Sequence, residues 1–380
     1  MINRSQERPQ KKAINDTLFI KNSLKLYLYK EPTMLKEKLL LSFLCFLFLP
    51  DTLLACTRAL YSSNDGKYTV TGRTMDWFEN VHSNLWAFPR GIARNGATKK
   101  NPLKWESQYG SVIVAGFDVG TTDGMNEKGL VVNLLYLGET DFGKRDLKRP
   151  GLSWSIYSQY ILDNFATVSE TVEAFKEDKI QVVASPLPGS SSKPPTVHFS
   201  LSDPSGDSAV FEYIKGKLVI HHGKQYKVMT NSPTYDQQLA LNTYWQSISG
   251  DSMLPGTRRA ADRFVRASYY IDHLPIAKSN RDAMAYVNSI MRNVSVPFGK
   301  SDPRKPNIAP TLWLTISDQK NKIYYYESTL SPGGVWVNLD QIDFNKGTPV
   351  KKLTLDNRPD LTGDLTKSFQ PAKAFTFAGK

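Results

Sequence analysis

The chain is poor in the side chains that most metal and thiol chemistry relies on, with two cysteines and five histidines among 380 residues. Two cysteines exclude a disulfide-rich scaffold. No histidine pair has the spacing of a metal site. His221 and His222 are adjacent on a predicted strand, so their side chains point to opposite faces. We therefore expect neither a metal ion nor any other cofactor.

Familiar catalytic signatures are also missing, because the chain contains no HExxH, no P-loop and no G-x-S-x-G. It has no zinc-finger spacing and no aromatic RNA-binding signature. The net charge of +12 arises largely from basic residues that are scattered among acidic ones. We expect a basic surface that attracts small anionic ligands and binds no nucleic acid.

One apolar run stands out, Leu39–Leu49, and its 11 residues are too few to span a membrane. It follows Met34, Lys36 and Lys38, which matches the charged start and apolar centre of a signal peptide. We therefore expect a periplasmic or secreted product with no membrane span, whose leader starts at Met34. The expected organisation is a polar upstream extension at 1–33, a signal peptide with a short pro-segment at 34–55, and a single catalytic domain at 56–380.

Cys56 follows this leader at a site that fits two processing routes. The sequence "LLAC" resembles a lipoprotein box, in which the thiol of Cys56 would carry a lipid. Alternatively, the leader is cut earlier and the pro-segment "DTLLA" is trimmed to leave Cys56 as the first residue. Ala55 is small enough for a signal-peptidase site, but Leu53 fits position −3 poorly. The leader leaves both routes open.

The rest of the chain predicts a layered α+β domain with antiparallel sheets. A β-meander is expected over 196–231, and "TLWLTISD" with "KIYYYES" predicts a later hairpin before a polar tail from about Thr348. The Pro/Ser/Gly-rich stretch Ser185–Pro195 indicates a long hairpin loop. Apolar periodicity predicts helices over Ser153–Phe165, Asp236–Ile248, Arg258–His273 and about 281–292. A capping-box pattern at Thr167 and Glu170 predicts the start of a further helix between the first two.

An N-terminal cysteine would carry its own base, the α-amine. The ordinary pKa of this amine, about 7.7–8.0, lies near the thiol value of about 8.5, so the amine can take the thiol proton without a histidine. Such chemistry needs an acidic group beside the amine, a cation beside the sulfur and donors for the oxyanion. Asp76 and Arg73 supply the first two if their strand pairs with the strand that starts at Cys56. The alternative is an ordinary surface salt bridge.

Five motifs occur in an order that resembles the choloylglycine hydrolase (bile salt hydrolase) and penicillin V acylase family of N-terminal nucleophile hydrolases. The resemblance runs from Cys56 to about Val337 through "CTR" (56–58), "GRTMDW" (72–77), "DGMNEKGL" (123–130), "MTNSPTYDQQL" (229–239) and "LPGTRRAADRFVRAS" (254–268). "WAFP" (86–89), the "LDNFAT" helix and the "SDPSGDSAVFEYI" hairpin are similar to the Gram-negative penicillin V acylase branch. That branch is associated with phenoxyacetyl amides and acyl-homoserine lactones more than with bile salts.

The resemblance implies a four-layer αββα sandwich with two antiparallel sheets, a linear amide as small-molecule substrate, and a homotetramer. It also implies a role for each matching residue: Cys56 as nucleophile with its freed amine as base, Arg73 beside the sulfur, Asp76 holding the amine, Asn231 and the backbone N–H of Tyr136 as oxyanion donors, Arg263 as the active-site arginine, and Trp77 and Tyr136 as walls of the acyl pocket.

Tyr136 departs from the bile salt hydrolases, which usually carry asparagine at this position, whereas penicillin V acylases often carry an aromatic residue. If the backbone N–H of Tyr136 is the oxyanion donor, the change of side chain leaves this donor in place and alters the pocket. Core packing is the alternative for Trp77 and Tyr136, a plain turn for Asn231, and a solvated helix position for Arg263. The competing function is a lipid-anchored binding lipoprotein acylated at Cys56, although such a protein has no use for the matched charged residues.

Overall fold

Several strands of this chain are unbroken apolar runs because both of their faces are buried. The fold is described from a computed structural model, which covers residues 56–186, 194–299 and 309–379. The predicted leader at 1–55, with Cys45, lies outside these residues. In β6 (Ser111–Gly116), Val112 and Val114 face one apolar core, whereas Ile113 and Ala115 face another. This alternation places a helical layer and a second sheet on opposite sides of the strand.

Two large sheets carry the architecture. The first has the strand order β14 (Val228–Met229), β1 (Thr57–Ser62), β2 (Thr69–Asp76), β15 (Thr311–Asp318), β16 (Ile323–Ser328), β17 (Val335–Asn338) and β19 (Gly363–Asp364). The second has the order β13 (Lys217–His222), β12 (Ser208–Ile214), β11 (Val197–Ser202), β8 (Val131–Tyr136), β7 (Gly120–Asn126), β6, β3 (Asn84–Phe88), β18 (Lys351–Leu353) and β20 (Gln370–Pro371). Apart from the short β17–β19 pair, neighbours within both sheets are antiparallel.

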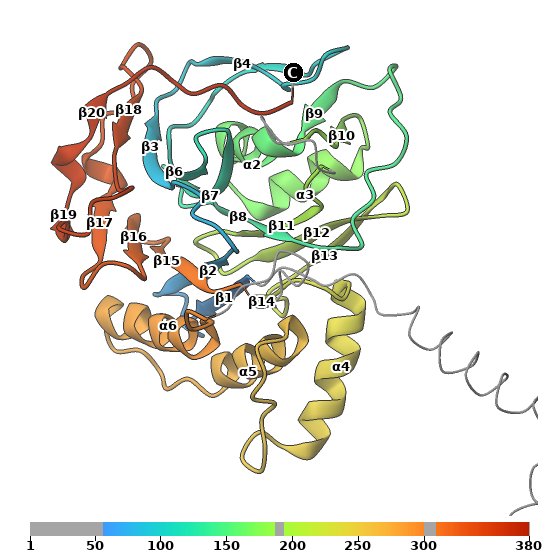
Figure 1. Cartoon of the computed structure of the whole chain (residues 1–380), viewed down its shortest axis with the longest axis vertical. Helices are drawn as coiled ribbons and strands as arrows, with labels where there is room; N and C mark the ends of the chain where they lie inside the picture. Colours follow the sequence, from blue (N-terminus) through green and yellow to red (C-terminus); the bar gives the residue numbers. More distant parts are fainter. Residues whose placement is uncertain (1–55, 187–193, 300–308, 380) are drawn as a thin grey trace, which may run out of the picture. The chain divides into compact units, whose positions relative to one another are not determined.

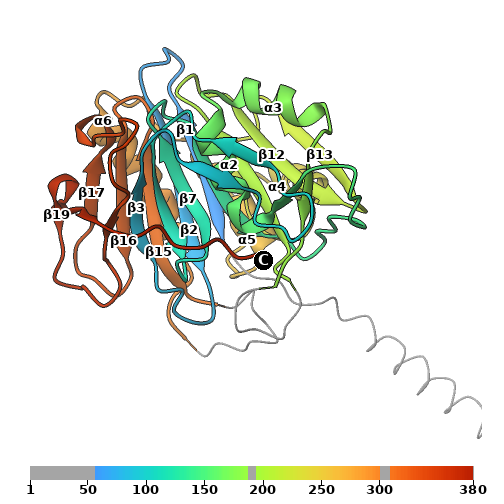
Figure 2. The ribbon, with the colours of Figure 1, turned by 90° about the horizontal axis from the view of Figure 1, so that it is seen from above.

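Helices cover the outer face of each sheet, which gives the four-layer αββα arrangement (Figure 1). The helices α5 (Ala260–Asp272) and α6 (Asn280–Val294) pack on β1 and β2, and α4 (Tyr235–Ile248) packs beside α5. The helices α2 (Trp154–Asn164) and α3 (Val168–Lys176) cover the nine-stranded sheet. The two sheets lie between these helical layers in Figure 1, and Figure 2 looks at the same domain from above, so that the layers overlap. The predicted α+β sandwich is confirmed.

Local signals fix the ends of the helices much as expected. Ser153 caps α2, and Thr167 with Glu170 forms the predicted capping box of α3. A close approach fixes α6 on the first sheet, because a Cβ at Gly72 would lie 2.6 Å from Val287 and 2.7 Å from Met291. Glycine in β2 therefore lets the helix sit directly over the strand that carries the candidate site.

Three expectations about strands are wrong. The stretch Ser185–Pro195, of which 187–193 lie outside the described residues, does not close a hairpin. Instead β10 (Gln181–Val183) pairs in parallel with β9 (Gly151–Ser153), and β11 joins the large sheet. The last strand of the predicted meander, β14, leaves the meander to pair with β1. The tail after Thr348 is not merely polar, since it adds β18 and β20 to a sheet and buries Phe369 and Phe377.

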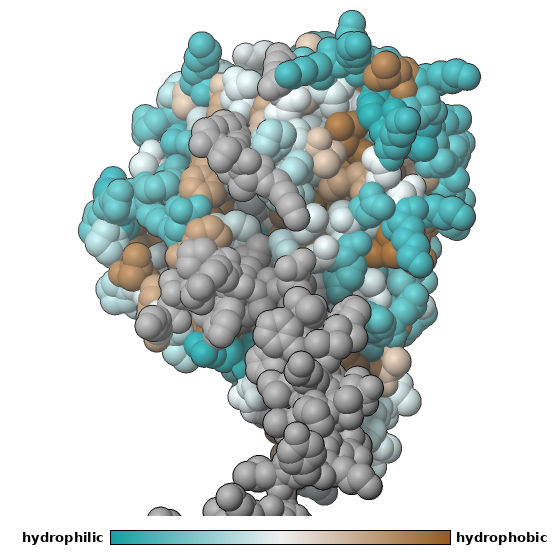
Figure 3. Space-filling view, turned by 45° about the vertical axis from the view of Figure 1, so that its right-hand side comes forward, coloured by the Kyte–Doolittle hydropathy of each residue, from teal (hydrophilic) through white to brown (hydrophobic). Residues whose placement is uncertain are grey.

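The surface of the described residues is mostly charged and polar. Figure 3 shows one face on which apolar residues form small patches separated by hydrophilic ones. The strongly exposed large apolar side chains come from distant parts of the sequence, such as Leu147, Tyr244, Ile276 and Leu330. Within the described ranges, no helix is long and apolar enough to cross a membrane.

Candidate active site

Alternation along β2 sends its two predicted site residues to opposite faces of the seven-stranded sheet. The strands β1 and β2 pair antiparallel, with Thr57 opposite Thr74, which confirms the predicted strand pairing. Arg73 and Met75 therefore face the second sheet, whereas Thr74 and Asp76 face the helices. Cys56 lies directly before β1, where groups from both faces of β2 can reach it.

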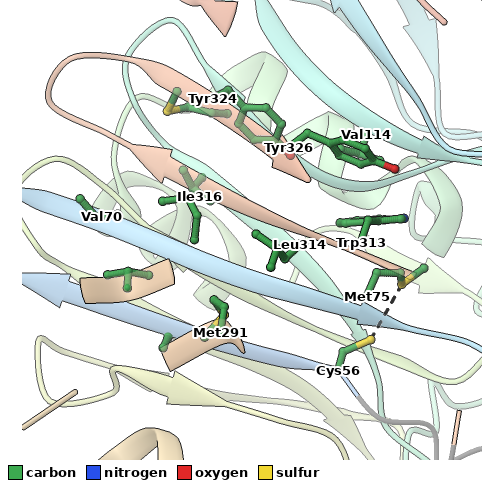
Figure 4. Close-up of a cluster of buried hydrophobic side chains, with 14 of the residues drawn as sticks. Cys56, Val70, Met75, Val114, Met291, Trp313, Leu314, Ile316, Tyr324 and Tyr326 are labelled. Atoms are coloured by element: carbon green, nitrogen blue, oxygen red, sulfur yellow. Dashed lines mark hydrogen bonds between the residues drawn. The ribbon is translucent and has the colours of Figure 1, made fainter. Parts of the chain in front are cut away.

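Arg73 and Met75 surround the thiol of Cys56. The Cys56 Sγ lies 3.9 Å from Arg73 Nη2 and 3.9 Å from Met75 Sδ, and Figure 4 shows the two sulfur atoms pointing toward one another. Arg73 is held by a hydrogen bond from Nη2 to the Leu134 carbonyl at 2.9 Å, and its guanidinium lies 4.4 Å from the ring centroid of Trp313. The cation is thus fixed in position beside the sulfur.

The charge of Arg73 is available to a thiolate. Both Arg73 and Cys56 are almost fully buried. Among the residues that the structure describes, Nε and Nη1 of Arg73 have no hydrogen-bond partner. Burial raises the pKa of the Cys56 thiol, and Arg73 is the strongest influence that lowers it again. Negative charge on Asp76 adds to the raising influences, and Arg263 adds to the lowering ones.

The backbone nitrogen of Cys56 donates to Oδ1 of Asn231, which also accepts from Arg263 Nη2 at 3.2 Å. The amide of Asn231 must therefore present its oxygen to these two donors and its nitrogen to the other side. That nitrogen, Nδ2, donates to the carbonyl of Tyr136 at 2.7 Å. The second Nδ2 hydrogen makes no hydrogen bond among the described residues, so it can serve as a donor to an oxyanion.

Tyr136 ends β8 with its backbone N–H turned away from β11. The neighbouring Leu137 N–H donates to the Thr196 carbonyl at 3.1 Å, and Tyr136 is opposite Val197. In an antiparallel ladder this pattern marks Tyr136 and Val197 as a non-hydrogen-bonded pair. The N–H of Tyr136 is therefore free of that ladder, and a second oxyanion donor next to Asn231 is geometrically compatible with the strand.

Asp76 lies on the helical side with Arg263. Its Oδ1 accepts from the Thr311 hydroxyl at 2.5 Å, and its Oδ2 lies 3.4 Å from Arg263 Nη1. Burial raises the pKa of Asp76 to about 6, against the opposing influence of Arg263. The nitrogen of Cys56, which is a peptide nitrogen in the uncut chain, bonds to Asn231 rather than to Asp76. A freed amine has more hydrogens to donate than this peptide nitrogen.

Gln238, a residue of α4, holds the segment that carries Asn231 by hydrogen bonds. The side-chain nitrogen of Gln238 donates to the carbonyls of Asn231 and Pro233, and its oxygen accepts from the Thr230 hydroxyl at 2.8 Å. Gln238 is fully buried. These bonds hold the backbone on both sides of Asn231, so they determine where its side chain points.

Sequence reasoning missed several of these supporting residues. Met75 lies two residues after Arg73, so alternation along a strand places both side chains on one face. Gln238 lies inside the motif "MTNSPTYDQQL". Leu134 acts through its carbonyl, which no side-chain pattern reveals. Thr311 and Trp313 come from β15, more than 230 residues after the start of the site, so no local signal links them to Cys56.

A mainly apolar pocket opens beside the thiol. It encloses about 610 Å³, counting the solvent at its mouth. The predicted Trp77 and Tyr136 both line it, together with Phe117 and Trp154 from other elements and with Cys56 and Arg73. Pockets with such a lining bind their ligands mainly by apolar contact.

Three of the five histidines pair with carboxylates and do not line this pocket. His221 Nε2 lies 2.8 Å from Asp236, His222 Nε2 lies 2.8 Å from Asp207, and the buried His198 pairs with Glu212. Within residues 56–186, 194–299 and 309–379, no group of three His, Cys, Asp or Glu side chains could hold a metal ion.

Comparisons with known proteins agree with one another. The profile of the family described as "Linear amide C-N hydrolases, choloylglycine hydrolase family" matches residues 56–352. The chain is 47% identical over 350 residues to the penicillin V acylase of Pectobacterium atrosepticum, covering 86% of this chain and 93% of that protein. It is 28% identical over 321 residues to the bile salt hydrolase/transferase of Clostridium perfringens, covering 77% and 93%. The structure of penicillin V acylase from Agrobacterium tumefaciens superposes with a TM-score of 0.79 at 48% identity, covering 86% of this chain and all of that one.

Proposed function

Because the chain belongs to the choloylglycine hydrolase family of linear amide C–N hydrolases, we propose that it cleaves phenoxyacetyl-type amides such as penicillin V, with Cys56 as nucleophile. The observation that carries this proposal is the thiol of Cys56 beside Arg73 in an apolar, aromatic-lined pocket. Family membership speaks against the non-catalytic lipoprotein. Acyl-homoserine lactones share the linear amide and an apolar acyl chain, so they form the second substrate class to test.

Cleavage of the Ala55–Cys56 bond frees the α-amine that the mechanism needs. The neutral amine takes the proton of the thiol, and the sulfur forms a bond to the amide carbonyl carbon while the C=O electron pair moves to oxygen. Asn231 Nδ2 and the N–H of Tyr136 stabilise that oxyanion. The protonated amine then gives its proton to the leaving nitrogen as the C–N bond breaks, which leaves a thioester on Cys56.

Hydrolysis of the thioester repeats the same proton path. Water gives a proton to the α-amine as its oxygen attacks the thioester carbon, and the C–S bond breaks as the sulfur recovers a proton from the amine. Arg73 stabilises the thiolate that starts the cycle and the thiolate that leaves at its end. Arg263 lies between Asp76 and Asn231, so it fixes the two groups that flank the nitrogen of Cys56.

Export and assembly also belong to this proposal. The leader predicted at 34–55 supports a periplasmic or secreted enzyme whose pro-segment is removed during maturation, by itself or by another protease. The family resemblance supports a homotetramer. Intact-mass and size measurements on the mature protein test both: we expect a free N-terminal Cys56 and four copies per particle. A diacylglyceryl adduct on Cys56 would contradict the mechanism.

Activity is tested with the purified mature enzyme and three substrates: penicillin V, an acyl-homoserine lactone and glycocholate. We expect the highest kcat/KM for penicillin V, no turnover for Cys56→Ala and severely weakened turnover for Cys56→Ser. Intact-mass analysis of a rapidly quenched reaction should find one acyl group on wild-type protein and none on Cys56→Ala. Unchanged activity in Cys56→Ala would overturn the mechanism, and glycocholate as the best substrate would overturn the proposed specificity.

A further inference from the structure

The C-terminal segment, which begins where the family match ends, contacts two loops that line the acyl pocket. The family profile ends at residue 352, and the segment 351–379 continues along β3 and ends near β9 (Figures 1 and 2). Two loops, 77–83 and 116–120, supply six of the residues that line the pocket: Trp77, Val81, Gly116, Phe117, Val119 and Gly120. We call these two loops the rim.

The first contact fastens the loop 116–120 at its tip. Lys352 Nζ donates to Asp118 Oδ2 at 2.7 Å, while Trp86 Nε1 donates to Asp118 Oδ1 at 2.8 Å. The Lys352 ammonium also lies 5.0 Å from the ring centroid of Trp86. Asp118 is therefore held by two donors from neighbouring strands of the nine-stranded sheet.

The second contact fastens the loop 77–83. Asp356 accepts from Asn80 Nδ2 at 3.2 Å and pairs with His82 Nδ1 at 2.8 Å. Its neighbour Leu355 donates its backbone N–H to Asn84 Oδ1 at 3.0 Å. One carboxylate of the C-terminal segment thus joins two side chains of the rim.

The third contact lies at the end of the segment. The Ala378 N–H donates to the Val119 carbonyl at 2.9 Å, and the Ala378 carbonyl accepts from the hydroxyls of Ser153 at 2.8 Å and Ser155 at 2.5 Å. Phe375 and Phe377 anchor this end by packing against the core of Trp86 and Phe88.

The rim needs such support because its backbone is strained. His82, Phe117 and Asp118 have φ angles of 46°, 52° and 49°, in the left-handed region that side chains other than glycine rarely adopt. Such conformations persist only where surrounding contacts fix them. The C-terminal segment supplies contacts to two of these three residues, and a hydrogen bond of 2.7 Å from Phe117 N–H to the Val81 carbonyl couples the two loops.

We propose that residues 351–379 are a specificity-determining strap that holds the rim in the shape required by a bulky acyl group. This inference rests on the proposed amidase function. The segment contacts none of Cys56, Arg73, Asp76, Asn231 and Arg263 in the hydrogen bonds and ion pairs of the described residues. Loosening it should therefore impair binding of a large acyl group and leave the chemistry of the thiol unchanged.

The test uses two variants of the mature enzyme. Asp356→Ala removes the bonds to Asn80 and His82, and a chain that stops at Phe377 removes the Ala378 contacts while keeping the aromatic anchor. The matched control is Asp360→Ala, which breaks an ion pair with Arg358 inside the same segment. Each protein is assayed on phenoxyacetyl and acetyl p-nitroanilides, which share one leaving group.

We expect both strap variants to lower the ratio of phenoxyacetyl to acetyl kcat/KM at least fivefold, mainly through KM of the phenoxyacetyl substrate. The rate at which iodoacetamide alkylates Cys56 should stay within twofold of wild type, as should all parameters of Asp360→Ala. An unchanged ratio in both strap variants, or an equal fall in the control, would overturn the strap. Failure of the wild type to hydrolyse either anilide would instead contradict the proposed function.

Discussion

The buried carboxyl group of Asp76 should make the stability of the uncut chain depend on pH. Its pKa rises from an ordinary value of 3.8 to about 6, because burial outweighs the attraction of Arg263. Between these values the folded chain keeps a proton that the unfolded chain releases. The stabilising contribution is therefore complete below about pH 4 and is lost as pH rises through about 6. The difference of about two pH units corresponds to about 3 kcal/mol at most.

The measurement compares Asp76→Asn with its parent, both in the full chain carrying Cys56→Ala, so that the nitrogen of residue 56 remains a peptide nitrogen. Asparagine imitates the protonated acid, so the free energies of unfolding should be similar at pH 4. By pH 7 the asparagine variant should have gained up to about 3 kcal/mol relative to the parent in urea unfolding. A difference that stays constant with pH, or that changes in the opposite direction, would refute the account of Asp76.

Three further perturbations test the site and the fold. Asn231→Ala should lower kcat for penicillin V by about 10²–10³ through loss of an oxyanion donor, and steady-state kinetics with an unchanged kcat would contradict that role. Arg73→Met should raise the pKa of the Cys56 thiol, measured as a shift of the iodoacetamide alkylation profile to higher pH that the exposed control Arg358→Met does not share. Leu162→Ala empties part of the core under α2 and should cost about 2–5 kcal/mol in urea unfolding, whereas a loss below 1 kcal/mol would show that the core collapses around the gap.

Regular periodicity allowed much of the fold to be predicted from the sequence. The capping box at Thr167 and the apolar spacing of α2, α5 and α6 depend on neighbours within a few residues, so the sequence alone reveals them. The pairing of β14 with β1 joins residues about 170 positions apart, and no local pattern encodes it. The same reason explains why β10 and β11, which flank a long loop, were expected to pair and do not.

The residues of the candidate site also differ in whether a local sequence signal could reveal them. Arg73 and Asp76 could be linked to Cys56 because the two strands are adjacent in sequence and their pairing is easily inferred. Asn231, Tyr136 and Arg263 became candidates only through the family resemblance, since they lie on distant elements. Thr311 and the Leu134 carbonyl had no signal of either kind, because one contributes a common hydroxyl and the other a backbone atom.

The alternation of β2 has a consequence for how such an enzyme can diversify. Met75 faces the acyl pocket and Asp76, the next residue, faces the opposite layer, so the pocket lining and the groups around the nitrogen of Cys56 occupy separate sides of one strand. Substitutions on the pocket side can change which acyl group is accepted while the groups around the nitrogen of Cys56 stay intact. An insertion or deletion of a single residue in β2 would exchange the two sides and disrupt both the pocket lining and those groups at once. New specificities in this scaffold are therefore expected to arise by replacement of side chains and by changes in loops, with the length of β2 held constant.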